Sequence, residues 1–255
     1  MQTTSIITIA KNHKAGLRRT LESISCLEGV NFEVVLVIGE SSDGTLEVGR
    51  KFVETSFRQS VLISQEESGI YEAMNEGIKA AKGDSIIFMN AGDCFENSSC
   101  LRKMQIELDN NDIGVVIGGY VVEGLEQRPR IGTRKDISPS RFAFNRHGGC
   151  HQAMLYRTTA VKFFGGYSLD YRLAADFDLT LRIISTFKGL RIPILVALIE
   201  PGGVADMGII EVHSEKHLSR KRILIKKHMV LYSLLWSFAA KTKIRLKGQF
   251  KKDFN

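Results

Sequence analysis

Asp93 stands in a setting that could present a carboxylate to a ligand. It follows a short apolar run at residues 85–89 and a turn-forming stretch at residues 90–92. Such a run is typical of a strand buried on both faces, and open α/β sheets bind ligands just beyond the C-terminal ends of their strands. A carboxylate there can bind Mg²⁺ or Mn²⁺ together with substrate phosphates. The structural alternative is that Asp93 only closes a turn after Gly92.

Two further aspartates, Asp176 and Asp178, lie in a segment with helical periodicity at about residues 171–182. A separation of two positions is about 200° around a helix axis, so the two carboxylates cannot face the same site. Asp178 has Arg182 four positions later, the spacing of a surface ion pair. Asp176 has no such partner and could take the proton of an attacking hydroxyl as a general base. The structural alternative is that Asp176 caps the start of the helix.

Two histidines, His147 and His151, flank a Gly-Gly-Cys sequence ahead of a strand-like segment at residues 153–156. A histidine on a glycine-rich loop could contact an acceptor or a phosphate. It could equally be a structural residue that only forms hydrogen bonds, and the sequence leaves both interpretations open.

The elements that must position these residues alternate between strands and helices. Strands followed by helices at this spacing predict a parallel sheet covered on both faces, with its ligand edge at the C-terminal ends of the strands. The glycine-rich signatures of dinucleotide-binding dehydrogenases and P-loop nucleotidases do not occur, which disfavours both classes. We expect strands at residues 5–9, 32–38, 61–63 and 85–89, and helices at about residues 17–25, 45–57 and 70–81.

The charge of the chain is unevenly distributed. Residues 216–255 hold 12 lysines and arginines against one acid, Asp253, and therefore carry +11. The whole chain carries +7, so the first 215 residues carry −4. Such an asymmetry concerns binding partners rather than fold. The four cysteines lack the paired spacing of a metal site, which predicts reduced thiols, and no signal peptide is expected at the start.

The basic segment contains a mostly apolar stretch at residues 229–240, which includes Tyr232 and Trp236. It is too short to span a bilayer, but with cations on both sides it suits an interfacial helix on anionic lipid. A helix packed on the core or on a second subunit is the alternative, so a homo-oligomer stays open. Nucleic-acid binding ranks last, because the body is acidic and the aromatic residues are not interleaved with the cations.

Short motifs occur in order along residues 4–205: SIIT at 5–8, SSDGT at 41–45, GIYEAMNEG at 69–77, NAGD at 90–93, HQAM at 151–154, ADFDLTLR at 175–182 and GGV at 202–204. Together they resemble the motifs of family 2 glycosyltransferases, most closely bacterial enzymes of surface-polysaccharide assembly of the colanic acid or O-antigen type. The resemblance implies a GT-A fold, a nucleotide-diphosphate sugar donor, a divalent cation and inversion at the anomeric carbon.

The resemblance also assigns expected roles to residues. It implies that Asp176 is the catalytic base and that Asp93 is a ligand of Mn²⁺ or Mg²⁺. Contacts to the donor or the acceptor are expected from Ile9, Glu40, Glu67, Gly69, Asn75, Asn90, Ala91, Gly92 and His151.

Three positions depart from the family pattern. Ile38 stands where an aspartate usually contacts the base, Glu67 where an aspartate is frequent, and Asn90 where the metal motif has its first acid. The Q-x-x-R-W motif of processive synthases is missing, which favours a single transfer per encounter. These departures leave an alternative open: a nucleotide-sugar-binding or scaffold protein that has lost catalysis.

From these observations we predict an α/β protein with a GT-A-like three-layer sandwich and a mostly parallel central sheet. The catalytic domain is expected at residues 1–205 and a basic amphipathic helical tail at residues 206–255. The expected partners are a nucleotide-diphosphate sugar, with a UDP-sugar favoured, a saccharide or lipid-linked saccharide acceptor, and an anionic membrane surface, but not a nucleic acid. We expect a cytoplasmic protein that can lie at the cytoplasmic face of the inner membrane.

Overall fold

A computed structural model of the 255-residue chain describes residues 2–66, 69–124, 129, 131–144, 149–202 and 209–223. The N-terminal part alternates strands and helices in the predicted order, because buried apolar residues recur with the period of each element. Its elements are β1 (Thr3–Ala10), α1 (Lys14–Ser25), β2 (Asn31–Gly39), α2 (Thr45–Thr55), β3 (Ser60–Gln65), α3 (Ile70–Ala80) and β4 (Ser85–Phe88). The predicted strands and helices of this part are therefore confirmed.

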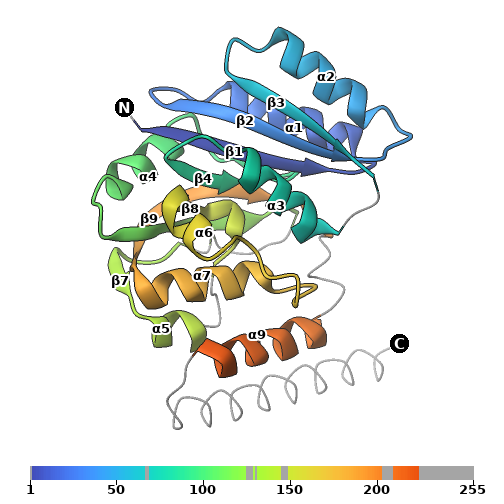
Figure 1. Ribbon diagram of the computed structural model, residues 1–255. Coiled ribbons are helices and arrows are strands. Elements are labelled where there is room, and N and C mark those ends of the chain that lie inside the picture. Colours follow the sequence, from blue (N-terminus) through green and yellow to red (C-terminus); the bar gives the residue numbers. More distant parts are fainter. Residues whose placement is uncertain are drawn as a thin grey trace.

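The second part of the chain adds the remaining strands and helices (Figure 1). It contains β5 (Cys94–Phe95), α4 (Cys100–Leu108), β6 (Ile113–Val122), β7 (Lys135–Ile137), α5 (Pro139–Phe144), the 3₁₀ turn η1 (His151–Ala153), β8 (Met154–Arg157), α6 (Thr158–Phe163), α7 (Ala175–Thr186), β9 (Lys188–Ile199) and α9 (Ile209–Ile223).

In the described part of the chain the strands form one nine-stranded sheet with the order β3-β2-β1-β4-β8-β6-β9-β5, and β7 pairs with β9. The longer contacts are parallel, namely β1 with β2 and β4, β2 with β3, and β6 with β9. The antiparallel contacts pair only two or three residues each. The sheet is thus mostly parallel, as predicted, and β1, β2, β3 and β4 all end at one edge.

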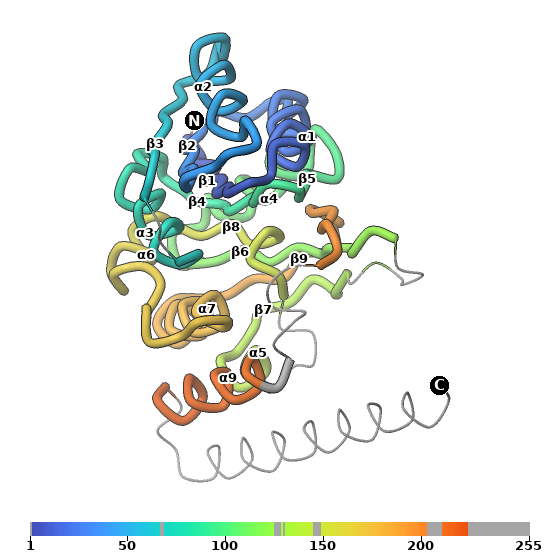
Figure 2. Tube along the Cα trace, turned by 90° about the vertical axis from the view of Figure 1, so that its right-hand side faces the viewer, coloured from blue at the N-terminus to red at the C-terminus, as the bar shows by residue number. Residues whose placement is uncertain are grey.

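Helices cover both faces of the sheet, which makes the predicted three-layer sandwich. The side chains of β1 alternate between the layers: Ile6 belongs to the buried cluster that contains residues of α1 and α4, whereas the neighbouring Ile7 belongs to the cluster that contains residues of α3, α6 and α7. Figure 2 shows α1 and α3 on opposite sides of the strands. Because both faces are covered, the central strands are buried along almost their whole length.

Helix α9 packs against α7 and runs beneath it in Figure 1. Arg220 of α9 is only 1 % exposed, with its guanidinium over the rings of Phe144 and Phe177, at 5.7 and 5.3 Å from their centroids. Its Nε donates to the carbonyl oxygen of Ala143 at 2.7 Å, and burial lowers the pKa of Arg220 to about 10. Part of the charge counted in the basic segment therefore faces the core.

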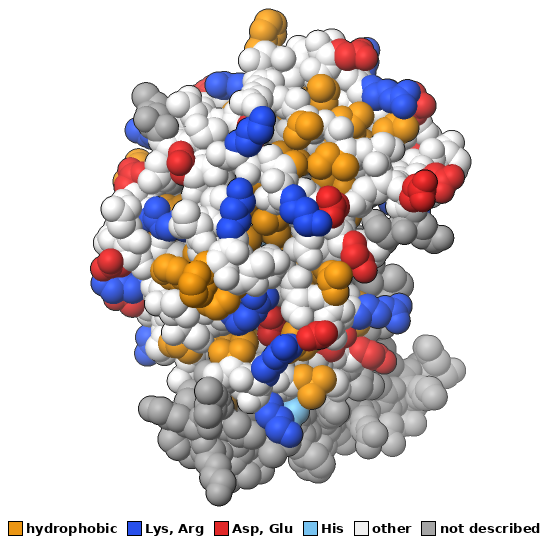
Figure 3. All heavy atoms as spheres, viewed as in Figure 1, with side chains coloured by type: hydrophobic (Ala, Val, Ile, Leu, Met, Phe, Trp, Pro, Cys, Tyr) orange, Lys and Arg blue, Asp and Glu red, His pale blue; other side chains and the backbone are white. Residues whose placement is uncertain are grey.

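Residues 224–255 lie outside the described residues, and so does the predicted interfacial helix at residues 229–240. Among the described helices none is long and apolar enough to cross a membrane. The four cysteines all lie in the described part, and each is a free thiol, as predicted. On the face shown in Figure 3, acidic and basic side chains are interspersed, which fits the small net charge of the first 215 residues.

Candidate active site

The turn that carries Asp93 is fixed by α1. The hydroxyl of Thr20 donates to the carbonyl oxygen of Asp93 at 2.7 Å and accepts the backbone N–H of Gly92 at 3.0 Å. Gly92 has φ of +101°, and a Cβ there would lie 2.1 Å from Oε2 of Glu200. The left-handed backbone conformation favours glycine here, whereas the crowding concerns only the end of a flexible side chain. The turn after β4 therefore has a single defined shape.

The carboxylate of Asp93 is 6 % exposed and accepts two hydrogen bonds. Nε2 of Gln152 donates to Oδ2 at 2.6 Å, and the backbone N–H of Glu200 donates to Oδ1 at 3.0 Å. The thiol of Cys150 donates to Oε1 of Gln152 at 2.6 Å, which orients the amide toward Asp93. Burial raises the pKa of Asp93, although these hydrogen bonds oppose the rise. A buried carboxylate of this kind would gain from a cation.

His151 connects the turn after β4 to α7. Its Nε2 lies 3.2 Å from Nδ2 of Asn90, and its Nδ1 lies 3.5 Å from Oδ2 of Asp176. Because an amide nitrogen can only donate, we assign the ring proton to Nδ1, from which it points to Asp176. Oδ1 of Asn90 is buried and has no hydrogen-bond partner among the described residues.

Asp176 lies in the first turn of α7, and its side chain is 26 % exposed, so a substrate hydroxyl can reach it. Oδ1 accepts the backbone N–H of Phe177 at 2.7 Å and lies 3.5 Å from the hydroxyl of Tyr71. Burial by itself would raise the pKa of Asp176. The hydrogen bond from His151, together with the charge of Lys216 on α9, outweighs burial and holds this pKa below its usual value.

Asp178 shows that one prediction from the sequence was wrong. We expected it in a surface ion pair with Arg182, but its side chain is only 3 % exposed. Oδ2 accepts Nε of Arg182 at 2.7 Å, and Oδ1 accepts the hydroxyl of Ser219 at 3.0 Å. The spacing of four positions correctly predicted that Arg182 is the partner of Asp178. Helix α9 covers Asp178, however, and buries its carboxylate.

The helix that carries both aspartates starts at Ala175, not at the predicted residue 171. The segment before it is held by Glu215 of α9. Its carboxylate accepts the backbone N–H groups of residues 172, 173 and 174 at 3.0, 2.8 and 2.8 Å. A carboxylate from a distant helix thus fixes the backbone that leads into α7.

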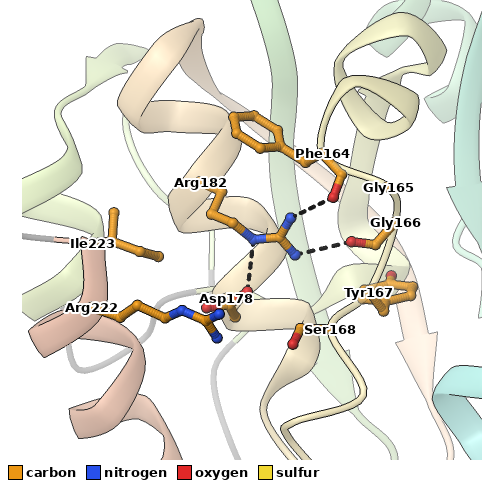
Figure 4. A pocket seen from close by; sticks show the side chains of 9 residues that line it. All are labelled: Phe164, Gly165, Gly166, Tyr167, Ser168, Asp178, Arg182, Arg222 and Ile223. Carbon is orange, nitrogen blue, oxygen red and sulfur yellow. Dashed lines mark hydrogen bonds and ion pairs between the residues drawn. The ribbon is translucent and has the colours of Figure 1, made fainter.

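A cavity of about 360 Å³ lies on the Asp178 side of α7 (Figure 4). Arg182 spans it and donates to the carbonyl oxygens of Phe164 and Gly166, both at 2.9 Å. Each of the three guanidinium nitrogens thus donates a hydrogen bond to the protein. Because Asp176 faces away from this cavity, toward His151, we do not assign the cavity to the active site.

The other predicted contact residues fall into two groups. Ile9, Ala91 and Gly92 lie together at the sheet edge, where the backbone N–H of Ala91 donates to the carbonyl oxygen of Ile9 at 3.1 Å. Glu40 is exposed just beyond β2, and Gly69 is the residue that precedes α3.

Asn75 is placed differently from the other predicted contact residues. Its amide donates to the carbonyl oxygen of Tyr167 at 2.9 Å and accepts the backbone N–H of the same residue at 2.8 Å. These two bonds occupy the amide in a structural role. Glu67 and His147 lie outside the described residues.

Sequence reasoning missed four functional candidates: Tyr71, Gln152, Glu200 and Lys216. Each reaches the site through a contact with residues far away in the chain, and such contacts have no local signature. The one available signal was that Tyr71 and Gln152 lie inside the motifs at residues 69–77 and 151–154.

The amino-acid sequence is similar to those of known glycosyltransferases. The family model "Glycosyl transferase family 2" matches residues 5–167. A PGL/p-HBAD biosynthesis glycosyltransferase of Mycobacterium bovis is 31 % identical over 181 residues, which cover 71 % of this chain and 69 % of that protein. An uncharacterized glycosyltransferase of Haemophilus influenzae is 28 % identical over 71 % of this chain and 61 % of its own length.

Solved structures show the same fold. S. aureus TarS 1–349 in complex with UDP-GlcNAc matches with a TM-score of 0.73 and 16 % identity, over 93 % of this chain and 73 % of that one. The mannosyltransferase PcManGT of Pyrobaculum calidifontis, in complex with GDP-Man and Mn²⁺, matches with a TM-score of 0.68 and 16 % identity, over 95 % and 75 %. With the GT-A architecture that these structures share and a family match over most of its length, this chain belongs to glycosyl transferase family 2.

Proposed function

We propose that this chain is an inverting glycosyltransferase that moves a sugar from a nucleotide-diphosphate sugar to a lipid-linked saccharide in bacterial polysaccharide assembly. One observation carries the proposal. His151 and Gln152 are consecutive residues of η1, and they bind Asp176 and Asp93 respectively. A single turn thus connects a candidate base to a candidate metal ligand, the two groups that glycosyl transfer requires.

The residues around Asp93 fit a hard divalent cation. Asp93 and Asn90 offer oxygen donors, and Oδ1 of Asn90 is a buried oxygen with no partner among the described residues. No group of three or more histidine, cysteine, aspartate or glutamate side chains in the described part could hold a metal by itself. Mg²⁺ commonly takes one or two protein ligands, with substrate phosphates and water completing its shell. We propose that Asp93 is the protein ligand of Mn²⁺ or Mg²⁺ and that the side-chain oxygen of Asn90 lies beside the bound ion.

When bound, such a cation would neutralise the diphosphate as it leaves. Asp176 supplies the remaining requirement, a base for the acceptor. As the acceptor oxygen bonds to the anomeric carbon and the bond to the phosphate oxygen breaks, the hydroxyl proton passes to the carboxylate of Asp176. A single displacement of this kind inverts the configuration at the anomeric carbon. His151 holds the carboxylate in place through Nδ1.

The comparisons support a nucleotide-diphosphate sugar as donor. One solved TarS structure contains UDP, another contains UDP-GlcNAc, and the PcManGT structure contains GDP-Man. We propose a UDP-sugar for this chain. For the acceptor, residues 224–255 carry eight lysines and arginines against Asp253. These charges favour an anionic membrane surface, at the cytoplasmic face of the inner membrane, where a lipid-linked saccharide would be met.

One observation keeps the alternative of a binding or scaffold protein in view. Ile38, at the position where the family usually has an aspartate, is fully buried, and its Cδ1 would lie 2.4 Å from a Cβ at Gly49. Ile38 therefore packs against α2 and presents no polar group to a base.

Two measurements test the proposed function in sequence. Thermal shift with UDP- and GDP-sugars, each with and without Mn²⁺, identifies the donor, because a ligand that binds only the folded state raises the melting temperature. Release of the nucleoside diphosphate is then measured with and without saccharide acceptors. Acceptor-dependent release that is lost in Asp176→Asn supports a transferase. Donor binding without acceptor-dependent release from any saccharide tested would favour the binding protein.

A further inference from the structure

Tyr71 reaches Asp176 from the opposite side to His151. It lies in the first turn of α3, is 8 % exposed, and its hydroxyl lies 3.5 Å from Oδ1 of Asp176. His151 lies at the same distance from the other oxygen, Oδ2. The two oxygens of the carboxylate thus face donors from two separate elements, α3 and η1.

We propose that Tyr71 is a positioning residue for the base Asp176, and that its hydroxyl sets the orientation of the carboxylate toward the acceptor. The inference rests on the proposed role of Asp176. Without the Tyr71 hydroxyl, Oδ1 would keep only the backbone N–H of Phe177, which is the neighbour of Asp176 in the chain. His151 alone would then hold the carboxylate from a separate element, at Oδ2. A contact of Oδ1 to the adjacent residue fixes its orientation less firmly than a donor from another helix.

The length of this contact is consistent with the role. Catalytic hydrogen bonds are frequently long in the absence of substrate and shorten in the complex that reacts. Burial, and after it the negative charge of Asp176, raise the pKa of Tyr71 far above its usual value, so its hydroxyl stays protonated and can donate. The proton that Asp176 takes therefore comes from the acceptor and not from Tyr71.

Tyr167 provides a matched control within the same aromatic cluster. Its ring lies 5.2 Å from the ring of Tyr71, and an equal distance separates it from the ring of Phe88. Tyr167 is 3 % exposed, and its hydroxyl has no hydrogen-bond partner among the described residues. Tyr167→Phe and Tyr71→Phe therefore remove the same atom from neighbouring buried rings, but only the second removes a donor to Asp176.

The protonation of Asp176 responds to groups on every element packed around it. Two groups lower its pKa: His151 on η1 through a hydrogen bond, and Lys216 on α9 through its charge. The charge of Asp176 in turn raises the pKa values of four neutral groups around it: Tyr71 on α3, Cys150, Tyr156 on β8 and Tyr167. Because the Tyr71 variant leaves all the others in place, a change in titration can be attributed to its hydroxyl.

The first test needs no substrate. Protein labelled with ¹³C at the aspartate carboxyls is titrated by NMR, and the Asp176 signal is identified by its loss in Asp176→Asn. A donor hydroxyl stabilises the ionised carboxylate. We expect the Asp176 signal to titrate at higher pH in Tyr71→Phe than in the wild type, and Tyr167→Phe to titrate like the wild type. Equal titration in all three proteins would overturn the proposal.

The second test uses the donor identified by thermal shift, with an acceptor that supports release. We expect kcat to fall by about 10-fold in Tyr71→Phe, the scale of one hydrogen bond to a charged group, with KM for the donor unchanged. Tyr167→Phe should keep kcat within about 2-fold of the wild type, since it removes no bond. Equal kcat values in the two variants would contradict the positioning role. A chain that transferred no sugar would contradict the proposed function, while the NMR test would still decide whether Tyr71 acts on Asp176.

Discussion

Asp176 and Asp178 lie two positions apart on α7, and their carboxylates point to opposite sides of that helix. Asp176 faces His151 and stays partly exposed, whereas Asp178 faces Arg182 and Ser219 and is buried. Two identical side chains therefore have different surroundings. We propose a role in chemistry for Asp176 and one in stability for Asp178, and substitution separates them.

Asparagine at each position distinguishes the two roles. Asp176→Asn keeps the shape but cannot take a proton, so we expect donor binding close to the wild type and a transfer rate lower by roughly 10²-fold or more. Asp178→Asn leaves Arg182 without its anion, so we expect a loss of about 3 kcal/mol in the free energy of unfolding and a nearly unchanged rate in the folded protein. Initial rates and urea unfolding measure both. A larger rate loss in Asp178→Asn would mean that the wrong side of α7 has been assigned to the active site.

Asp93→Asn should change stability in opposite directions with and without metal. The raised pKa of Asp93 means that its ionised form destabilises the metal-free fold. This penalty is present at neutral pH and disappears as the pH falls through the raised pKa. We therefore expect metal-free Asp93→Asn to melt above the wild type at neutral pH, with a smaller difference in acid. Mn²⁺ with UDP should stabilise the wild type alone. Equal Mn²⁺-dependent stabilisation of the variant would remove Asp93 from the metal site.

Lys216→Met should move the pH dependence of transfer. Lys216 lies over the ring of Phe177, 5.4 Å from its centroid, and its charge lowers the pKa of Asp176. Because the base acts in its ionised form, loss of that charge should shift the acid limb of kcat/KM to higher pH. Lys221→Met removes an equal charge from an exposed position on the same helix and is the control. The same shift in both variants would indicate a general effect of net charge.

Glu215→Gln should loosen the start of α7. The carboxylate accepts three backbone N–H groups, and the amide is a weaker acceptor without charge. We expect about 1–2 kcal/mol less stability and faster amide hydrogen exchange at residues 172–174. Glu211→Gln, exposed on the same helix, should change neither. Unchanged exchange in Glu215→Gln would show that α7 starts correctly without this contact.

Truncation of the chain after Ile223 tests whether the basic segment binds an anionic membrane. This truncation keeps Glu215, Lys216 and Arg220, which pack against α7, and removes eight lysines and arginines from residues 224–255. We expect the full chain to bind anionic vesicles at low salt and to lose binding as salt screens the charges, and the truncated chain not to bind. Neutral vesicles are the control. If the full chain ignores anionic vesicles at low salt, the segment serves as a core or subunit contact instead.

The predictions for β1 to β4 were correct because burial on both faces leaves a direct record in apolar periodicity, whereas β5, β6, β7 and β9 were not predicted. The sequence also placed Asp93 at the correct edge, since the ends of parallel strands follow from their order. It failed where a contact depends on a distant element. The spacing of Asp178 and Arg182 identified the pair, but nothing local shows that α9 covers it.

The basic segment illustrates the same limit. The sum of charges in residues 216–255 is correct, yet Arg220 is buried. Composition counts cations without showing which way they face. Likewise, the hydroxyl of Tyr71 finds Asp176 only when α3 and α7 come together.

The contact between Glu215 and the start of α7 has a consequence for synthesis. A chain leaves the ribosome from its N-terminus, and 122 residues separate Asp93 from Glu215. At roughly 5–20 residues per second, Glu215 follows Asp93 after about 6–24 s. During that interval the nascent chain can complete the sheet edge while the helix that bears Asp176 still lacks its anchor. The approach of Asp176 to its partners on η1 and α3 would therefore be fixed only late in synthesis, after Glu215 has emerged.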